Sequence, residues 1–251
     1  ESLERVMDSL RRQTLSPDRW ELVVVDNAST PPVPAGLVEW KGASGRLVRE
    51  PRTGILWARV RAFGEAAGEA LVLVDDDTVL APDYLERALE YLAARPRVGL
   101  AGGVLAAEFE REPPRWMIPY LPYLAVDGGG GPERLMTRYR DWRRLPPGAG
   151  MVLRRAVAQA HLAAIGKHPE LHGLGARGDV LERSEDTDLA LTALDLGFAA
   201  AWTPTLRLTH LIPARRMTVE YVERLLEGSA YSTEVLRQLR GFSRKPVWVR
   251  R

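Results

Sequence analysis

Three consecutive aspartates, Asp75, Asp76 and Asp77, follow directly on a short apolar run, and this junction constrains the fold more than any other stretch. The run at 70–74 is too short for a helix and is typical of a strand buried on both faces in a parallel sheet. Open parallel sheets bind ligands beyond the carboxyl ends of their strands. Crowded carboxylates need a neutralising cation, so we predict a Mg²⁺ or Mn²⁺ site that in turn holds phosphate. The alternative is a solvated acidic turn that caps a helix at 82–94.

Composition narrows the classes of function. The chain of 251 residues contains no cysteine, which excludes a disulfide framework, a zinc–thiolate site and a cysteine nucleophile. No apolar run is long enough to span a bilayer and no signal peptide is visible, so we expect a cytoplasmic protein. Nearly all of the positive charge is arginine, which favours bidentate binding of phosphate or carboxylate.

Polar residues also end an earlier apolar run. A predicted amphipathic helix at 1–14 is followed by a predicted strand at 20–25, and then by Asp26 and Asn27. Parallel strands would place these residues at the same sheet edge as the three aspartates. Asp26 and Asn27 offer a carboxylate and an amide to the edge of a base or to ribose hydroxyls. The alternative is that they only form a turn.

A helix that starts at a glycine is predicted at 53–68, after a short edge strand at 46–49. Its N-terminal end and Arg59 are suited to binding a pyrophosphate. The alternative is an exposed helix with solvated arginines.

The order of four motifs resembles the family 2 glycosyltransferases of the GT-A fold. The motifs are Val-Val-Val-Asp-Asn-Ala-Ser-Thr, Gly-x-x-x-Ala-Arg, Leu-Val-Leu-Val-Asp-Asp-Asp and Ser-Glu-Asp-Thr-Asp-Leu. The resemblance extends from Glu1 to about Ser232. It implies an α/β fold with a Rossmann-like, mostly parallel central sheet flanked by helices. We expect one domain with a nucleotide-sugar-binding half (1–108), a smaller acceptor and catalytic half (109–228), and a C-terminal helix with a basic tail (229–251).

The resemblance also implies roles on the donor side. Asp26, with Asn27 beside it, would contact the nucleotide base. Asp75 would meet the ribose, Asp77 would bind the metal on the diphosphate, and Asp76 fills the middle position. Family members begin with a central strand and a Pro-x-Tyr-Asn-type loop, and nothing before Glu1 supplies either. We therefore expect that a native N-terminal strand is missing from this sequence, because its loss would expose two pairing edges.

On the acceptor side, a strand at 99–109 leads into an irregular segment at 111–123. Its aromatic residues, and Trp142 further along the chain, are suited either to stacking on sugars or to packing on the core. The aromatic residues within the segment are Trp116, Tyr120 and Tyr123. A strand at 148–155 is similar to the family's glycine-containing strand beneath the donor sugar. Its small residues, Gly148, Ala149 and Gly150, would let the backbone approach a ligand closely.

A helix begins near Ser184, a plausible cap, with Glu185 and Asp186 in its first turn. Acids there often only complement the helix dipole. The resemblance implies instead that Asp186 is the general base and that Glu185 orients the acceptor hydroxyl. A strand at 202–210 ends on His210, which is either a structural histidine or, as in relatives, a metal ligand. A loop at 211–216 follows, in which Arg215 and Arg216 are placed to close over a diphosphate.

The end of the chain is predicted to be helical from Ser229 and then basic. Its cations and interleaved aromatics are Arg237, Arg240, Phe242, Arg244, Lys245, Trp248, Arg250 and Arg251. This segment suits either an anionic membrane surface or a solvated tail. No nucleic-acid reader motif accompanies it.

These observations predict a metal-dependent, inverting glycosyltransferase. The expected donor is a nucleotide diphosphate sugar, most simply a UDP-sugar, and the acceptor is a carbohydrate, a lipid-linked molecule or a small molecule with a free hydroxyl. The expected location is the cytoplasm, with peripheral contact at the inner face of the membrane. The rivals are a nucleotidyltransferase that makes a sugar nucleotide, and a non-catalytic sugar-nucleotide-binding protein.

Overall fold

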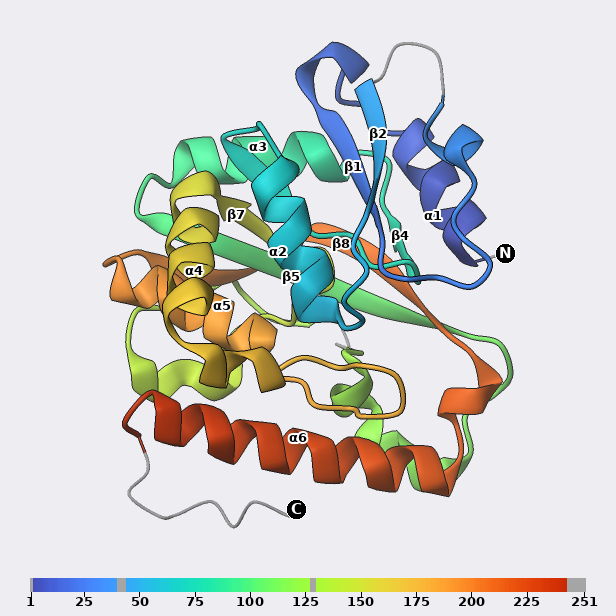
Figure 1. Cartoon of the computed structure of the whole chain (residues 1–251), viewed down its shortest axis with the longest axis vertical. Helices are drawn as coiled ribbons and strands as arrows, with labels where there is room; N and C mark the ends of the chain where they lie inside the picture. The colour runs from blue at the N-terminus through green and yellow to red at the C-terminus, as the bar shows by residue number, and fades with distance from the viewer. Residues whose placement is uncertain (1, 40–43, 127–129, 243–251) are drawn as a thin grey trace.

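The chain forms a mixed α/β fold in which helices cover both faces of a central sheet (Figure 1). The computed structural model describes residues 2–39, 44–126 and 130–242. Its α-helices are α1 (Ser2–Arg11), α2 (Ile55–Glu65), α3 (Tyr84–Ala94), α4 (Arg155–Lys167), α5 (Glu185–Asp195) and α6 (Val219–Leu239). Its strands are β1 (Glu21–Asp26), β2 (Ser44–Arg49), β3 (Ala70–Val72), β4 (Thr78–Leu80), β5 (Val98–Phe109), β6 (Arg134–Met136), β7 (Val152–Arg154) and β8 (Ala199–Ile212). Short 3₁₀ segments connect them: η1 (Pro17–Arg19), η2 (Ala35–Val38), η3 (Arg115–Leu124), η4 (Tyr139–Arg144), η5 (Pro169–Gly173) and η6 (Ala214–Arg216).

Within the described residues the strands form two sheets. β1 and β2 pair in parallel, and the larger sheet has the order β3–β7–β5–β8–β4, with β6 beside β8. Most paired residues belong to the parallel ladders β1–β2 and β5–β8, in agreement with the predicted mostly parallel architecture. The strand before the aspartates differs from its prediction, because β3 pairs antiparallel with β7. Gly150, at φ +71°, turns the chain so that β7 can return beside β3.

The larger sheet is assembled on β8, which pairs with β4, β5 and β6. Its parallel ladder with β5 contains a bulge. Gly102 pairs with Trp202, whereas the next pairing joins Val104 to Arg207. A Cβ on Gly103 would lie 2.0 Å from a backbone oxygen of β8, so the bulge requires glycine at this position.

Alternate residues of the sheet face two different helical layers. Leu100, Leu153 and Ala200 pack against α2, α4 and α5, whereas the neighbouring residues Ala101 and Val152 pack against α1 and α3. This period-two alternation is the one that a pleated strand imposes on its side chains. Both layers are therefore anchored to the same strands, β5, β7 and β8.

Several predicted boundaries shift in the structure. The helices expected at 1–14, 53–68 and 82–94 are confirmed with shorter limits, and the irregular segment at 111–123 contains η3. The strand expected at 148–155 is limited to β7, because Arg155 already begins α4. The loop expected at 211–216 starts as strand, since Leu211 and Ile212 continue the β8 ladder with β5.

The two expected divisions of the domain also fall inside elements. Residue 108 lies within β5, and residue 228 lies within α6. The helix continues through this second division because Val222, Leu225 and Leu236 are all buried along it. The acceptor half and the C-terminal helix are thus one continuous packing unit.

The basic C-terminal segment is only partly described. Arg244, Lys245, Trp248, Arg250 and Arg251 lie outside the described residues. Three of the remaining members make contacts within the fold: Arg237 pairs with Glu234, Arg240 with Asp188, and Phe242 with Tyr139. In the part of the chain that the structure describes, no helix combines the length and the apolar character needed to cross a membrane.

Candidate active site

Asp77 lies between β3 and β4 and contacts two basic side chains, one near the end of β8 and one on η6. Its Oδ2 lies 3.3 Å from His210 Nε2 and 2.8 Å from Arg216 Nη2. The sheet fixes this approach, because Thr78 pairs with His210 and the Leu211 N–H donates to the Asp77 carbonyl at 2.8 Å. The structure therefore brings the predicted metal carboxylate and the predicted histidine together.

Charges around Asp77 favour its ionised form. Burial opposes ionisation, but the hydrogen bond and charge of His210, together with Arg216, outweigh it and lower the pKa of Asp77. Asp76 behaves oppositely: desolvation, and then the charges of Asp77 and Asp75, raise its pKa although its side chain is exposed. Of the three adjacent acids, Asp77 is the one matched with two basic groups, whereas Asp75 lies near Arg59.

The residues at this position fit a hard divalent cation. The carboxylate oxygen of Asp77 and the imidazole nitrogen of His210 are spaced like neighbouring ligands of one ion, which leaves positions for water and phosphate oxygens. His210 Nδ1 is buried and has no hydrogen-bond partner among the described residues, so Nε2 is the nitrogen that faces Asp77. Across the described residues, no set of three or more such ligands is preassembled.

Arg59 lies inside the protein, and the alternative of an exposed helix with solvated arginines is wrong at this position. The residue is 8% exposed, its Nη1 donates to Glu185 Oε1 at 2.9 Å, and its Nη2 lies 3.7 Å from Asp75 Oδ1. Burial works against the charge, but Glu185, Asp75 and Asp186 outweigh it and raise the pKa of Arg59. The guanidinium thus bridges two carboxylates, and its role toward a pyrophosphate stays a prediction.

Glu185 and Asp186 open α5 beside Arg59. Asp186 Oδ2 accepts a hydrogen bond from Gly148 N at 2.9 Å, and its Oδ1 accepts one from Thr187 N at 2.7 Å. Glu185 is buried, its Oε2 has no partner among the described residues, and burial raises its pKa to about 7 against the opposing charge of Arg59. The two acids therefore occupy different environments, one held by backbone N–H groups and one by an arginine.

The glycines of 148–150 permit these contacts. A Cβ on Gly148 would lie 2.4 Å from Arg59 Nη2, and a Cβ on Gly150 would lie 2.1 Å from Leu208. Ala149 is buried between them. Tyr84 was not identified from the sequence, yet its buried hydroxyl donates to the Gly150 carbonyl. An aromatic residue at the start of a helix carries no signal of this role.

The side chains of Asp26 and Asn27 form hydrogen bonds with backbone groups at the end of β1. Asp26 Oδ1 accepts from Ser29 N at 2.8 Å, and this contact contributes most to lowering the pKa of Asp26. The Asn27 amide donates to the Arg52 carbonyl at 2.6 Å and accepts from Gly54 N at 2.8 Å. These are the contacts expected of turn formers, and they hold the β1 end against the start of α2. Binding of a base by this pair stays a prediction.

The predicted sugar-stacking aromatics divide into two groups. Trp116 is 41% exposed and Tyr123 is 48% exposed, so both side chains are accessible to a ligand. Tyr120 packs against the apolar cluster between η3 and α6, and Trp142 packs against the cluster that contains the end of α6.

Comparison with known proteins identifies the family and the fold. Glycosyl transferase family 2 matches residues 1–160. A Sinorhizobium fredii protein described as "Uncharacterized protein y4gI" is 29% identical over 231 residues, which is 85% of this chain and 23% of that protein. The chain thus spans about a quarter of the length of this curated relative.

Solved structures share the fold. S. aureus TarS in complex with UDP-GlcNAc superposes with a TM-score of 0.58 at 15% identity, over 96% of this chain and 70% of that one. GalNAc-T7 with UDP, GalNAc and Mn²⁺ gives a TM-score of 0.53 at 16% identity, over 96% of this chain and 51% of that one. With the family match covering well over half of its length, the chain belongs to glycosyl transferase family 2 and has the GT-A fold.

Proposed function

We propose that this protein transfers a sugar from a nucleotide diphosphate donor, a UDP-sugar, to an acceptor hydroxyl with inversion at the anomeric carbon. Membership of glycosyl transferase family 2 supports glycosyl transfer. UDP-GlcNAc is the ligand of TarS, and UDP, GalNAc and Mn²⁺ accompany GalNAc-T7, which supports a UDP-linked donor and a divalent cation here.

One observation carries this proposal. The Asp186 carboxylate, fixed by the Gly148 N–H, and the Asp75 carboxylate both act on the charge of the buried Arg59. A group that can accept a proton and an acid of the donor side therefore lie near the same buried arginine. This is the arrangement that a single displacement needs, with a base at the acceptor and charged groups at the leaving diphosphate.

The chemistry requires one step. Asp186 takes the proton of the acceptor hydroxyl, the oxygen attacks the anomeric carbon, and the bond from that carbon to the diphosphate oxygen breaks. The leaving nucleoside diphosphate carries away the bonding electron pair. Both oxygens of Asp186 already accept backbone hydrogen bonds, which orients the carboxylate while leaving lone pairs for the incoming proton.

Asp77 and His210 would hold the cation, whose charge would stabilise the departing diphosphate. Arg216 contacts the same Asp77 oxygen, so the guanidinium and a metal ion compete for it. Once displaced, Arg216 would bind the diphosphate, as would Arg215 on the same segment. On the base side, Asp26 and Asn27 would contact the nucleotide, with Asp75 and Asp76 nearer the ribose.

The acceptor is proposed to be a carbohydrate, a lipid-linked molecule or a small molecule. The exposed Trp116 and Tyr123 favour a ligand that presents a sugar or another flat apolar surface. We place the reaction in the cytoplasm or at the inner face of the membrane.

The test is a screen of nucleotide sugars by thermal shift with Mn²⁺, followed by product analysis. A donor at 100 times its dissociation constant should stabilise the protein by about 2.7 kcal/mol. Transfer releases UDP and forms a product of inverted anomeric configuration, measured by NMR. Release of pyrophosphate would instead identify a nucleotidyltransferase, and binding without turnover with any acceptor would identify a sensor.

A further inference from the structure

We propose that Arg240 is a positioning residue, which locks α6 onto α5 and thereby sets where Glu185 and Asp186 stand in the site. This inference rests on the proposed function of that pair. Arg240 caps the C-terminal end of α6, and 52 residues of chain separate it from Asp188 on α5. Figure 1 shows the C-terminal end of α6 below α5 in this view, and one apolar cluster joins Leu191 of α5 to Leu236 of α6.

Arg240 contacts α5 through all three of its nitrogens. Its Nε donates to Asp188 Oδ1 at 2.7 Å, its Nη2 donates to the Asp188 carbonyl at 3.0 Å and to Thr192 Oγ1 at 3.2 Å, and its Nη1 pairs with Asp195. Asp188 is 1% exposed and follows Asp186 by two residues. A forked, planar guanidinium with several partners fixes orientation as well as distance.

The charge of Asp188 depends on Arg240. His161 Nδ1 lies 3.5 Å from Asp188 Oδ2, but burial lowers the pKa of His161 to about 3, so this ring is neutral near pH 7. Among the described residues, Arg240 is then the cation in contact with the buried carboxylate, whose pKa is raised by burial against the opposing charge of Arg240. Without Arg240 this carboxylate would have to take up a proton or gain access to water, and either change removes the bonds that hold α5 to the end of α6.

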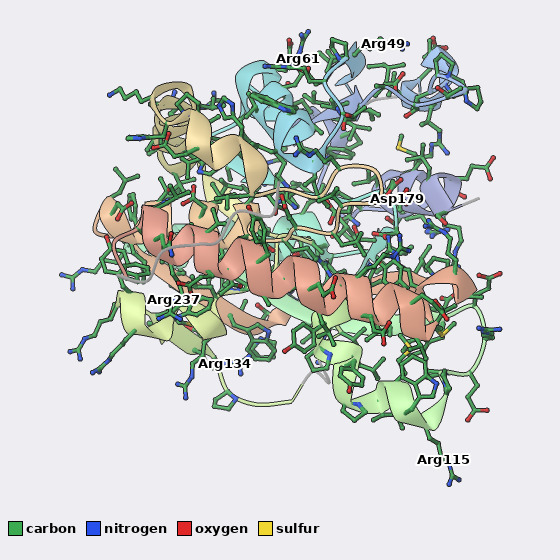
Figure 2. All side chains as sticks on the ribbon, turned by 60° about the horizontal axis from the view of Figure 1, so that its bottom comes forward. Arg49, Arg61, Arg115, Arg134, Asp179 and Arg237 are labelled. Carbon is green, nitrogen blue, oxygen red and sulfur yellow. The ribbon has the colours of Figure 1, made fainter. Side chains whose placement is uncertain are left out.

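The same helix also holds the residues on the other side of the catalytic pair. A Cβ on Gly228 would lie 2.4 Å from the Leu181 carbonyl, so α6 touches the preceding segment directly. Ser232 Oγ accepts from Arg183 N and from Ser184 Oγ, each at 3.1 Å. Figure 2 shows this segment, marked by Asp179, lying along α6.

Ser184 is the N-cap residue of α5, as predicted, and its carbonyl accepts a hydrogen bond from Asp188 N. Its hydroxyl makes no capping bond to the backbone of α5 and instead donates to Ser232. Contacts from α6 therefore hold the chain on both sides of Glu185 and Asp186. Ser232 contacts the residues just before the pair, and Arg240 contacts residues after it. Movement of α6 would shift Asp186 relative to Gly148, and a shift of about 1 Å in reacting groups can cost on the order of 10²-fold in rate.

The experiment compares three variants: Arg240→Leu, Arg240→Lys and Leu236→Ala. Leu236 is a buried residue of the same helix in an apolar cluster with Leu191 of α5, and its truncation weakens this packing while it leaves the ion pair of Arg240 in place. Well below the unfolding temperature, Arg240→Leu should lower kcat by about tenfold or more while KM for the donor changes by less than about threefold. Arg240→Lys should recover part of kcat. Leu236→Ala should lower Tm but keep kcat within about threefold.

A second readout does not depend on turnover. The Gly148 and Thr187 amides donate to Asp186, so their hydrogen exchange should accelerate in Arg240→Leu and not in Leu236→Ala. If Arg240→Leu does not fold, Ser232→Ala removes the contact of α6 on the other side of the catalytic pair. The hydrogen exchange of the same two amides should then accelerate. Unchanged exchange, or kcat that falls in step with Tm in both Arg240→Leu and Leu236→Ala, would overturn the inference. A wild-type protein without transferase activity would refute the proposed function, and the exchange result would still decide the role of Arg240.

Discussion

The acids of the candidate site occupy two regions whose charges are neutralised in different ways. Asp77 is matched by His210 and by Arg216, a residue on a short 3₁₀ segment whose side chain is 22% exposed. Glu185 is matched by Arg59 from inside α2, where both side chains are about 10% exposed or less. One of the two basic partners of Asp77 is thus partly exposed, whereas the arginine that pairs with Glu185 is buried in the core.

This difference suits the two halves of a displacement reaction. A carboxylate that must accept a cation with each donor needs a partner that can leave, whereas a base must keep one position and one environment through every cycle. The comparison predicts that substitutions in the first region change metal and nucleotide binding, and that substitutions in the second change the rate of transfer.

The largest effect is expected for Asp186→Asn. The amide keeps the shape but cannot take the acceptor proton, so transfer should fall by on the order of 10²-fold or more, while UDP affinity changes by less than about threefold. Kinetics with saturating donor and calorimetric titration of UDP measure the two quantities. The same substitution at Asp179, which is fully exposed, should leave both unchanged.

Glu185→Gln sharpens this test, because an orienting contact is not the proton acceptor and should cost less than Asp186→Asn. Near-normal transfer by Asp186→Asn would show that its carboxylate only complements the helix dipole. If Asp186→Asn lost UDP binding as severely as Asp77→Asn does, the two regions would not differ in function.

Asp77→Asn should produce the opposite profile, in which UDP binding no longer depends on the metal. His210→Ala should lower Mn²⁺ affinity by about tenfold or more if the imidazole is a ligand. Calorimetric titrations of UDP with Mn²⁺ and with EDTA measure both effects, and Asp83→Asn, which removes an exposed carboxylate paired with Arg87, serves as the control. Equal UDP affinities of the wild-type protein with and without EDTA would remove the metal from the proposal.

A smaller effect is expected for Arg216→Ala. The guanidinium competes with a cation for Asp77, so its removal should raise the Mn²⁺ affinity of the nucleotide-free protein by about two- to fivefold, the size of a partly exposed ion pair. Direct titration of Mn²⁺ checks this, with Arg224→Ala as a matched loss of one arginine. Weaker Mn²⁺ binding in Arg216→Ala would mean that Arg216 supports the ion and does not compete with it.

The smallest effect concerns stability and pH. Burial raises the pKa of Glu185 from its ordinary 4.5 to about 7, so its contribution to stability is complete below about pH 4.5 and is lost as the pH rises to about 7. Glu185→Gln removes this titration. Its Tm relative to the wild type should therefore rise between pH 5 and pH 7.5, by on the order of 2–4 °C for each kcal/mol recovered. Exposed Glu220→Gln should show no such trend, and a parallel pair of Tm profiles for Glu185→Gln and the wild type would contradict the buried-acid assignment.

Local patterns in the sequence were enough to predict the main elements and the strand ends that carry acids. Short apolar runs followed by Asp26 and Asp77 mark those ends, and a strand ending near His210 was predicted where β8 lies. These features depend on neighbouring residues alone, which is why hydrophobic periodicity captures them.

Contacts between distant segments were beyond such patterns. Arg59 and Glu185 are 126 positions apart, and nothing local distinguishes a buried arginine from the solvated ones on the same helix. Arg240 was predicted to belong to a basic tail, yet it forms an ion pair with Asp188 inside the fold. The antiparallel return of β7 beside β3 depends on the turn at Gly150, whose positive φ is a property of the folded chain.

The bulge opposite Gly103 has a consequence for how this chain tolerates changes in length. On β8, residues that face the core precede the bulge and His210 follows it. The number of residues in the bulge therefore decides which face of the sheet His210 occupies relative to those core residues. Because side chains alternate with period two, a single-residue insertion or deletion between Arg207 and His210 would turn the imidazole to the opposite face of the sheet. The bulge itself is unpaired and can absorb an added residue without shifting that phase. We expect length variation among descendants of this sequence to gather at 203–206 and to spare 207–210, a pattern that a library of single-residue insertions would reveal.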